Sequence, residues 1–230
     1  MTAPEKVLRE LIALPSVNPA LLPAGDPRAG ETRVAEFLAG LAAKAGLDVE
    51  HQEVFPRRSN LLIRLAPLNR IRQRILLAPH LDTVGVASDE QFRPKTKGGR
   101  LHGRGACDTK GSVAVMFCAL LDLAKSPRRP VGTEIIFCAL VDEEVGQSGS
   151  RRLVRSGVKA SLAVVGEPTR LKVVTAHKGD LWLELETRGK AAHGSRPELG
   201  RNAIHQMAKI VDLLETDYAA QLRRRRKFAE

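Results

Sequence analysis

Residues 75–86, ILLAPHLDTVGV, join an apolar run to a histidine and an aspartate. The run from Ile75 to Pro79 is typical of a buried strand, and His80 and Asp82 follow where it ends. Side chains at positions i and i+2 lie on the same side of extended backbone, so His80 and Asp82 are predicted to point together. A metal-ligating histidine usually donates its other ring N–H to a carboxylate, and this pair matches that arrangement. An ordinary His–Asp pair at an exposed strand end is the alternative.

Three further segments place carboxylates where a strand or turn ends. GRGACDTKG puts Asp108 in a glycine-flanked turn before a helix, ALVDEEVG ends an apolar strand with Asp142, Glu143 and Glu144, and LAVVGEPT ends another with Glu167. Ligands of open α/β sheets bind beyond the carboxyl ends of the strands. Converging carboxylates repel one another unless a cation lies between them. Imidazole with carboxylates suits zinc or a similar first-row divalent ion.

Hydrophobic periodicity predicts an α/β fold with a largely buried sheet between helices. The expected helices are residues 3–14 (capped by Thr2), 31–45, 111–125, 149–156 and 202–222. The expected strands are residues 48–55, 60–65, 74–79, a short one near Leu101, 133–141, 161–165, 171–177 and 181–188.

The net charge of +11 suggests acidic partners, but the basic residues are scattered apart from the run at 223–227. One Trp, one Tyr and six Phe are too few to interleave with them as stacking aromatics, so no nucleic-acid partner is expected. No apolar run approaches the roughly 20 residues of a membrane span, and the N-terminus lacks a signal-peptide core, so we expect a cytoplasmic protein without a membrane partner. The cysteines, Cys107, Cys118 and Cys138, form no CxxC pair and are expected to be reduced and buried.

Taken in order, PHLDTV, GRGACDTKG, VDEEVG, VVGEPT and AAHGSRPELGRNAI resemble the acetylornithine deacetylase and succinyl-diaminopimelate desuccinylase family. Its members are zinc- or cobalt-dependent amidohydrolases and exopeptidases, and its relatives include aminoacylase and carboxypeptidase G. The resemblance runs from the N-terminal helix to about residue 222. It implies a zinc-exopeptidase-like catalytic domain with a mixed sheet, an α+β lid that forms a homodimer, and hydrolysis of an N-acyl amino acid in arginine or lysine biosynthesis.

The resemblance also implies the metal ligands. His80, Asp108 and Glu167 would hold the first Zn²⁺ or Co²⁺, Asp108 would bridge to a second ion, and Glu144 would ligate that second ion. Two ions roughly 3.5–4 Å apart can share activation of water and polarisation of the carbonyl.

Other roles follow from the same resemblance. Asp82 would orient His80, and Glu143 would be the general base that takes a proton from the activated water. The peptide bond between Asp108 and Thr109 would be cis. His193, in the lid, would reach the substrate in a partner subunit's active site.

The sequence departs from the family in one respect. Relatives have a longer chain with one more histidine ligand for the second metal, and lid Asn and Arg residues that bind the substrate carboxylate. We therefore expect residues 1–178 to be a catalytic domain without its C-terminal segment, and 179–230 to be the first strand and helix of the lid. One complete metal site is expected. The alternative is a non-catalytic remnant, or half of a split enzyme, that retains the fold and one metal site.

Overall fold

The computed structural model describes residues 1–177, 179 and 181–225, which fall into two units, residues 1–173 and residues 174–230. The predicted domain boundary adjoins Lys178, and the basic run ends at Lys227; both residues lie outside the described part of the chain. The helices of the first unit are α1 (Ala3–Ala13), α2 (Thr32–Lys44), α3 (Lys110–Lys125) and α4 (Ser148–Arg155). Its strands are β1 (Asp48–Phe55), β2 (Arg58–Leu65), β3 (Gln73–Ala78), β4 (Lys95–Lys97), β5 (Arg100–His102), β6 (Thr133–Ala139) and β7 (Leu162–Val165).

The main sheet of the first unit is mixed, as the resemblance implied. Its strand order is β1-β2-β6-β3-β7, and β4 and β5 form a separate hairpin. Strands β3, β6 and β7 are parallel, whereas β1 and β2 join the sheet in the antiparallel sense. The carboxyl ends of β3, β6 and β7 therefore meet at one edge of the sheet.

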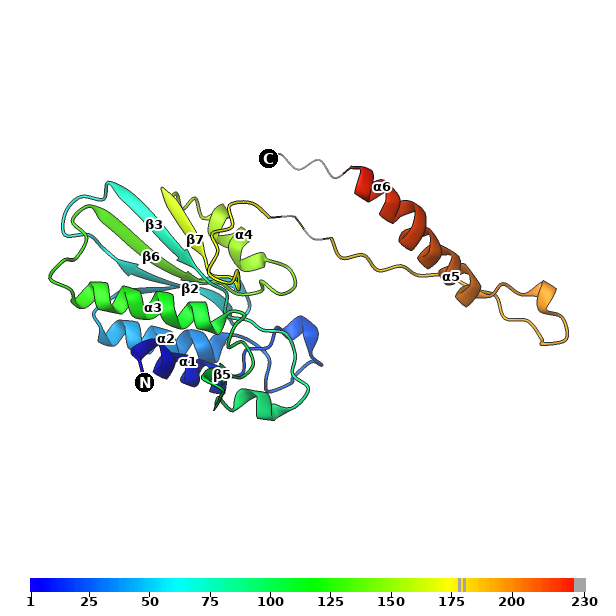
Figure 1. The fold of residues 1–230 in the computed structure, drawn as a ribbon, viewed down its shortest axis with the longest axis horizontal. Coiled ribbons are helices and arrows are strands. Elements are labelled where there is room, and N and C mark those ends of the chain that lie inside the picture. Colours follow the sequence, from blue (N-terminus) through cyan, green and yellow to red (C-terminus); the bar gives the residue numbers. More distant parts are fainter. Residues whose placement is uncertain (178, 180, 226–230) are drawn as a thin grey trace. The chain divides into compact units, whose positions relative to one another are not determined.

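Alternating side chains of the central strands fill a separate core on each face of the sheet, because successive side chains point to opposite faces. On one face Leu61, Ile63 and Phe137 pack with residues of α1, α2 and α3. On the other face Leu62, Ile136, Cys138, Ala78 and Leu153 of α4 form a smaller cluster. Figure 1 shows α1, α2 and α3 lying together along one side of the sheet. The expected sheet between helices is confirmed.

Local signals place the helix ends. The Thr2 side chain accepts a hydrogen bond from the Glu5 N–H at 3.4 Å and caps α1 as expected. Gly46, with φ of 72°, ends α2 in the left-handed conformation that favours glycine. Strand β7 is the outermost strand of the sheet, next to β3, and all four of its residues are exposed.

Two predicted strands are wrong, residues 171–177, which span the boundary between the units, and residues 181–188 of the second unit. None of residues 171–177 and 181–188 is in a strand; these residues are extended or irregular. A strand needs a neighbour to pair its N–H and C=O groups. In the described part of the second unit that pairing is a single bridge between Lys190 and Arg201. The expected first strand of a lid domain is therefore not formed.

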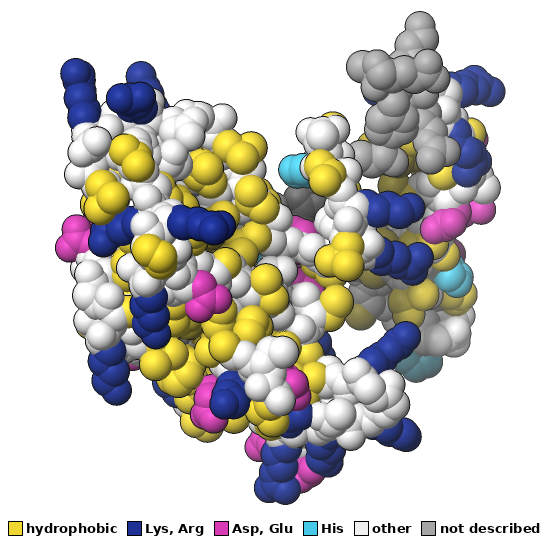
Figure 2. Space-filling view, turned by 60° about the vertical axis from the view of Figure 1, so that its left-hand side comes forward, with side chains coloured by type: hydrophobic (Ala, Val, Ile, Leu, Met, Phe, Trp, Pro, Cys, Tyr) yellow, Lys and Arg dark blue, Asp and Glu magenta, His cyan; other side chains and the backbone are white. Residues whose placement is uncertain are grey.

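The predicted helix 202–222 exists but is interrupted. It consists of α5 (Ala203–Leu213), a π-helical turn (Leu214–Tyr218) and α6 (Ala219–Arg224). The Asn202 side chain caps α5 by accepting from the N–H groups of Ile204 and His205. None of the helices in the described residues is long and apolar enough to cross a membrane. Figure 2 shows Lys and Arg side chains dispersed among apolar and uncharged ones rather than gathered on one patch.

Candidate metal centre

The chain delivers His80 to the edge where the three parallel strands end. Backbone pairing continues beyond β3 and β6, because Leu140 N–H donates to the Pro79 carbonyl (2.9 Å) and Leu81 N–H donates to the Leu140 carbonyl (2.7 Å). His80 thus lies beside the segment that carries Glu143 and Glu144. The third strand, β7, ends two residues before Glu167.

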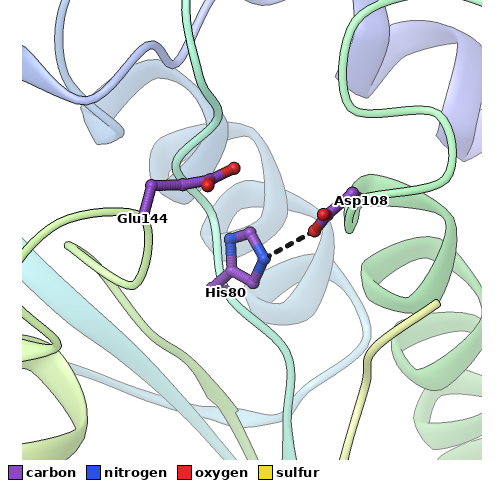
Figure 3. A group of neighbouring side chains, drawn as sticks. All are labelled: His80, Asp108 and Glu144. Atoms are coloured by element: carbon purple, nitrogen blue, oxygen red, sulfur yellow. Dashed lines mark hydrogen bonds and ion pairs between the residues drawn. The ribbon is translucent and has the colours of Figure 1, made fainter. Parts of the chain in front are cut away.

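The His80 imidazole faces several carboxylates. Its Nε2 atom lies 3.0 Å from Asp108 Oδ1, 3.7 Å from Glu143 Oε2 and 3.9 Å from Glu167 Oε1. Ligand atoms of His80, Asp108 and Glu144 all lie within 4.8 Å of one another. Figure 3 shows His80 between the other two, with Asp108 and Glu144 directed toward it from separate segments. The motifs that carry His80, Asp108, Glu143–Glu144 and Glu167 therefore converge, as the sequence predicted.

The contacts of the second ring nitrogen, Nδ1, fix the tautomer and the ring orientation of His80. His80 Nδ1 lies 3.0 Å from the Asp82 backbone oxygen. A carbonyl oxygen only accepts, so Nδ1 carries the hydrogen, and in the neutral ring the lone pair of Nε2 faces the carboxylates. The carboxylate of Asp82 lies 3.5 Å from Nδ1 and supplements this contact. This tautomer suits a metal ligand.

The electrostatics of the cluster favour a positive charge at its centre. Burial by itself lowers the pKa of His80, but hydrogen bonds with Asp108 and Asp82 outweigh it and raise that pKa to about 11. Burial, together with the charges of Glu143, Asp108 and Glu144, raises the pKa of Glu167 to about 7. The neighbouring carboxylates favour the charged form of His80 and disfavour the charged form of Glu167.

Asp82 has a second set of contacts that the sequence did not predict. Its buried carboxylate accepts hydrogen bonds from the backbone N–H groups of Glu143 (3.0 Å) and Glu144 (3.1 Å). It also accepts from Asn18 Nδ2 at 2.8 Å. Burial by itself raises the pKa of Asp82, but the hydrogen bonds with His80, Asn18 and the Glu143 N–H outweigh it and hold that pKa below its usual value. Asp82 thus contacts both His80 and the backbone of the neighbouring acidic pair.

The loop that carries Asp108 is held from two sides. The Asp108–Thr109 peptide bond is cis, which confirms the prediction. The Thr109 hydroxyl donates to the Gly166 carbonyl, which ties this loop to the residue before Glu167. Lys110, fully buried, donates from Nζ to the carbonyls of Leu11 (2.8 Å) and Leu14 (2.7 Å) at the end of α1.

Cysteine placement corrects one expectation. Cys118 and Cys138 are buried free thiols as predicted, but Cys107 is exposed, since it precedes Asp108 in the turn at the open side of the site.

His193 belongs to the second unit. Its Nδ1 lies 2.8 Å from the Ser195 hydroxyl oxygen, and the side chain is exposed. Sequence reasoning missed Asn18, which contacts Asp82, and Lys110, which holds the start of α3 against the end of α1. Their signals in the sequence were weak. Asn18 lies in the Pro-rich segment SVNP, and Lys110 follows two residues after the aspartate of GRGACDTKG.

The donor set fits a divalent metal ion. The site offers one imidazole nitrogen, from His80, and several carboxylate oxygens. His80 is buried and the carboxylates are partly exposed, so an ion could enter from solvent. Imidazole–carboxylate sets are typical of zinc and other first-row divalent ions.

The sequence profile of Peptidase family M20/M25/M40 matches residues 76–222. The chain is 32% identical over 218 residues to an acetylornithine deacetylase of Proteus mirabilis, covering 92% of this chain and 54% of that protein. It is 32% identical over 198 residues to a probable succinyl-diaminopimelate desuccinylase of Staphylococcus epidermidis, covering 82% and 47%. The chain thus spans about half the length of these curated relatives.

Solved structures share the fold. An M20 family metallo-carboxypeptidase of Sulfolobus solfataricus superposes with a TM-score of 0.68 at 18% identity, covering 93% of this chain and 50% of that one. A tripeptidase of Staphylococcus aureus gives a TM-score of 0.62 at 21% identity, covering 91% and 55%. Profile, identity and fold agree with the motifs at the strand ends, and the chain belongs to Peptidase family M20/M25/M40.

Proposed function

We propose that the chain carries the metal-binding part of an amidohydrolase that cleaves an N-acyl amino acid. The observation that carries the proposal is the His80 Nε2 atom, buried and directed at the carboxylates of Asp108, Glu143 and Glu167. The curated relatives named acetylornithine deacetylase and succinyl-diaminopimelate desuccinylase support an N-acyl amino acid as the substrate class.

We assign His80, Asp108 and Glu167 as ligands of one Zn²⁺ or Co²⁺, with Asp108 and Glu144 directed to a second. A bound divalent ion would lower the pKa of a water molecule and polarise the scissile carbonyl. The carboxylates would supply most of the negative charge, and His80 would bind as the neutral tautomer described above. The Nδ1–H bond to the Asp82 carbonyl would keep its ring aimed.

Glu143 is the proposed general base. Its carboxylate lies 3.7 Å from His80 Nε2, close enough to the cluster to take a proton from the attacking water and pass it to the leaving amine. Glu144, the next residue, is grouped with His80 and Asp108. The hydrogen bonds from the N–H groups of Glu143 and Glu144 to Asp82 hold these two residues in one turn. Their adjacent side chains can then serve different roles, one as base and the other as metal ligand.

His193 is the proposed substrate-binding residue of a homodimer formed through the second unit. Substitution of His193 by Ala is expected to raise KM more than it lowers kcat.

Metal binding is the direct test. The chain, purified without chelator, is expected to hold at least one equivalent of Zn²⁺ or Co²⁺ by elemental analysis, and His80→Ala should remove it. His102→Ala, an exposed histidine on β5, is the control and should leave the metal content unchanged. Less than about half an equivalent in the wild type, unaltered by His80→Ala, would sink the proposal.

Turnover separates a hydrolase from a chain that only binds metal. Hydrolysis of N-acetyl-ornithine and N-succinyl-diaminopimelate is measured on the metal-loaded protein, and Glu143→Ala is expected to lose about 10²–10⁴-fold while retaining metal. Loss of metal in Glu143→Ala but not in Glu144→Ala would reverse the two roles. Full metal binding without hydrolysis of any N-acyl amino acid would favour the non-catalytic alternative.

A further inference from the structure

Asp142 lies directly before the acidic pair and has no part in the proposed chemistry. It is 4% exposed and adopts φ of 65°, the left-handed region that non-glycine residues rarely occupy. A residue stays in that conformation only where the surrounding structure holds it there. The side-chain contacts of Asp142 identify those surroundings.

The carboxylate of Asp142 closes its own turn. Its Oδ2 accepts from the Ser148 N–H at 3.3 Å, and its backbone carbonyl accepts from the Gln147 N–H at 2.5 Å. A Cβ on Gly146 would come within 2.6 Å of Oδ2, so the turn folds tightly around this carboxylate. Glu143 and Glu144 are part of that closed turn.

A single amide group links this turn to the residue behind His80. Asn18 Nδ2 donates to Asp142 Oδ1 at 3.0 Å and to Asp82 Oδ2 at 2.8 Å. The NH₂ group has two hydrogens, and each serves one carboxylate. The other atom, Asn18 Oδ1, accepts from the Ala20 N–H at 3.1 Å, so the side chain is fixed in this orientation.

The positive charge of Arg58 balances the carboxylates of Glu31 and Asp142. Arg58, at the start of β2, makes a two-pronged ion pair with Glu31, at 2.8 Å from Nε and 2.6 Å from a terminal nitrogen. The same terminal nitrogen lies 3.6 Å from Asp142 Oδ1. Glu31 is 1% exposed, and its Oε1 also accepts from the Asp142 N–H at 3.2 Å. Two buried carboxylates, those of Glu31 and Asp142, thus share the guanidinium of Arg58. Buried charges require such a partner of opposite charge.

We propose that Arg58, Glu31, Asp142 and Asn18 form a buried polar bridge that positions Glu143 and Glu144 relative to His80. The bridge joins Arg58 of β2, Glu31 at the start of α2 and Asn18 to the turn at residues 142–147, and it reaches His80 through Asp82. None of the four residues touches the reacting atoms in the proposed mechanism; they are positioning residues. The inference rests on the proposed function in one respect: a misplaced Glu143 or Glu144 impairs metal binding or catalysis only if the two residues have the roles proposed above.

The test substitutes the cation and its buried partner together. Arg58→Met alone would leave the Glu31 carboxylate buried without a counter-ion and could unfold the chain, so Arg58→Met/Glu31→Gln is the main variant. Arg64→Met is the matched control, because Arg64 lies on the same strand and pairs with Glu50 at 2.7 Å at the surface.

Amide hydrogen exchange by NMR reads the turn directly and needs no metal. In the double variant, exchange of the N–H groups of residues 143, 144, 147 and 148 is expected to accelerate at least about tenfold more than exchange in β6, which serves as the internal reference. In Arg64→Met the ratio should not change. An unchanged ratio in the double variant would overturn the bridge.

A Co²⁺ titration followed by visible absorption measures how loosening of the turn changes metal affinity. The double variant is expected to bind Co²⁺ about tenfold more weakly than wild type, at the low end for residues that support metal ligands, and Arg64→Met should bind as wild type. A loosened turn with undiminished Co²⁺ affinity contradicts the positioning role. A wild-type chain that binds no Co²⁺ contradicts the proposed function instead, and the exchange ratio then decides the bridge alone.

Discussion

Two helices of this chain show why an apolar stripe alone does not make a core. Helix α3 of the first unit buries Val113, Ala114, Phe117 and Leu120 against the sheet, and the ring of Phe117 packs on that of Phe137 with centroids 5.7 Å apart. Helix α5 of the second unit is also amphipathic, yet none of its residues is buried. Both sequences are apolar at helical spacing, but α3 has a sheet of its own unit to cover.

The same contrast holds for extended segments. Strand β6 pairs with β2 on one side and β3 on the other, and six of its seven residues are buried. Leu181 and Leu183 are 81% and 71% exposed, and their segment forms no strand. Burial of apolar area provides most of the free energy of folding, so the second unit should be much less stable than the first.

The largest expected effect is on hydrogen exchange in the wild type. Amides of α3 and β6 should exchange at least about 10³-fold more slowly than amides of residues 181–225, because core elements open only in global unfolding whereas exposed segments open locally. Mass spectrometry of peptic fragments measures this. Equal protection in both units would break the comparison and reveal packing in the second unit.

The next effect compares two leucines. Leu61→Ala removes a fully buried side chain of the first unit and is expected to cost about 2–5 kcal/mol in the free energy of unfolding. Leu183→Ala, at a 71% exposed position, should change it by no more than about 0.5 kcal/mol. Urea unfolding followed by circular dichroism gives both values. A similar cost for the two substitutions would contradict the assigned burial.

A smaller effect tests how the end of α1 is bound to the start of α3, two residues after Asp108. Lys110→Met deprives the carbonyls of Leu11 and Leu14 of their donor. Burial, with a smaller effect of Arg33, lowers the pKa of Lys110 to about 7, so removal of a costly buried ammonium partly offsets the loss. A net cost of about 1–2 kcal/mol is expected by urea unfolding. Lys125→Met, exposed at the other end of α3, is the control and should cost less than about 0.5 kcal/mol.

The smallest effect sharpens the comparison at a helix end. Asn202→Ala removes the cap of α5 and is expected to destabilise that helix by about 1 kcal/mol. Since α5 buries no residue, this loss should appear as a fall in helicity, seen in the Cα chemical shifts of residues 203–213, with the unfolding midpoint of the first unit unchanged. A shift of that midpoint instead would show that the two units unfold together.

Much of the candidate metal centre could be predicted from the sequence because most of its residues follow strands. The apolar runs that end in His80 and Asp142–Glu144 identify strands, and parallel strands bring their carboxyl ends to one edge. Asp108 was readable from its glycine-flanked turn. The metal roles of these residues, and of Glu167, stay predictions until metal binding is measured.

Apolar runs and periodicity in the sequence predicted most elements of the first unit, although not β4, and the residues at the strand ends predicted that its acidic motifs meet. Only the tertiary structure showed the bridge from Arg58 to Asn18, the anchoring of α1 by Lys110 and the absence of strands at 171–177 and 181–188. Periodicity reports which face of an element is apolar, and that is a local property. Whether a buried ion pair forms, or a strand finds a partner, depends on groups distant in sequence, because burial and pairing are properties of the assembled neighbours.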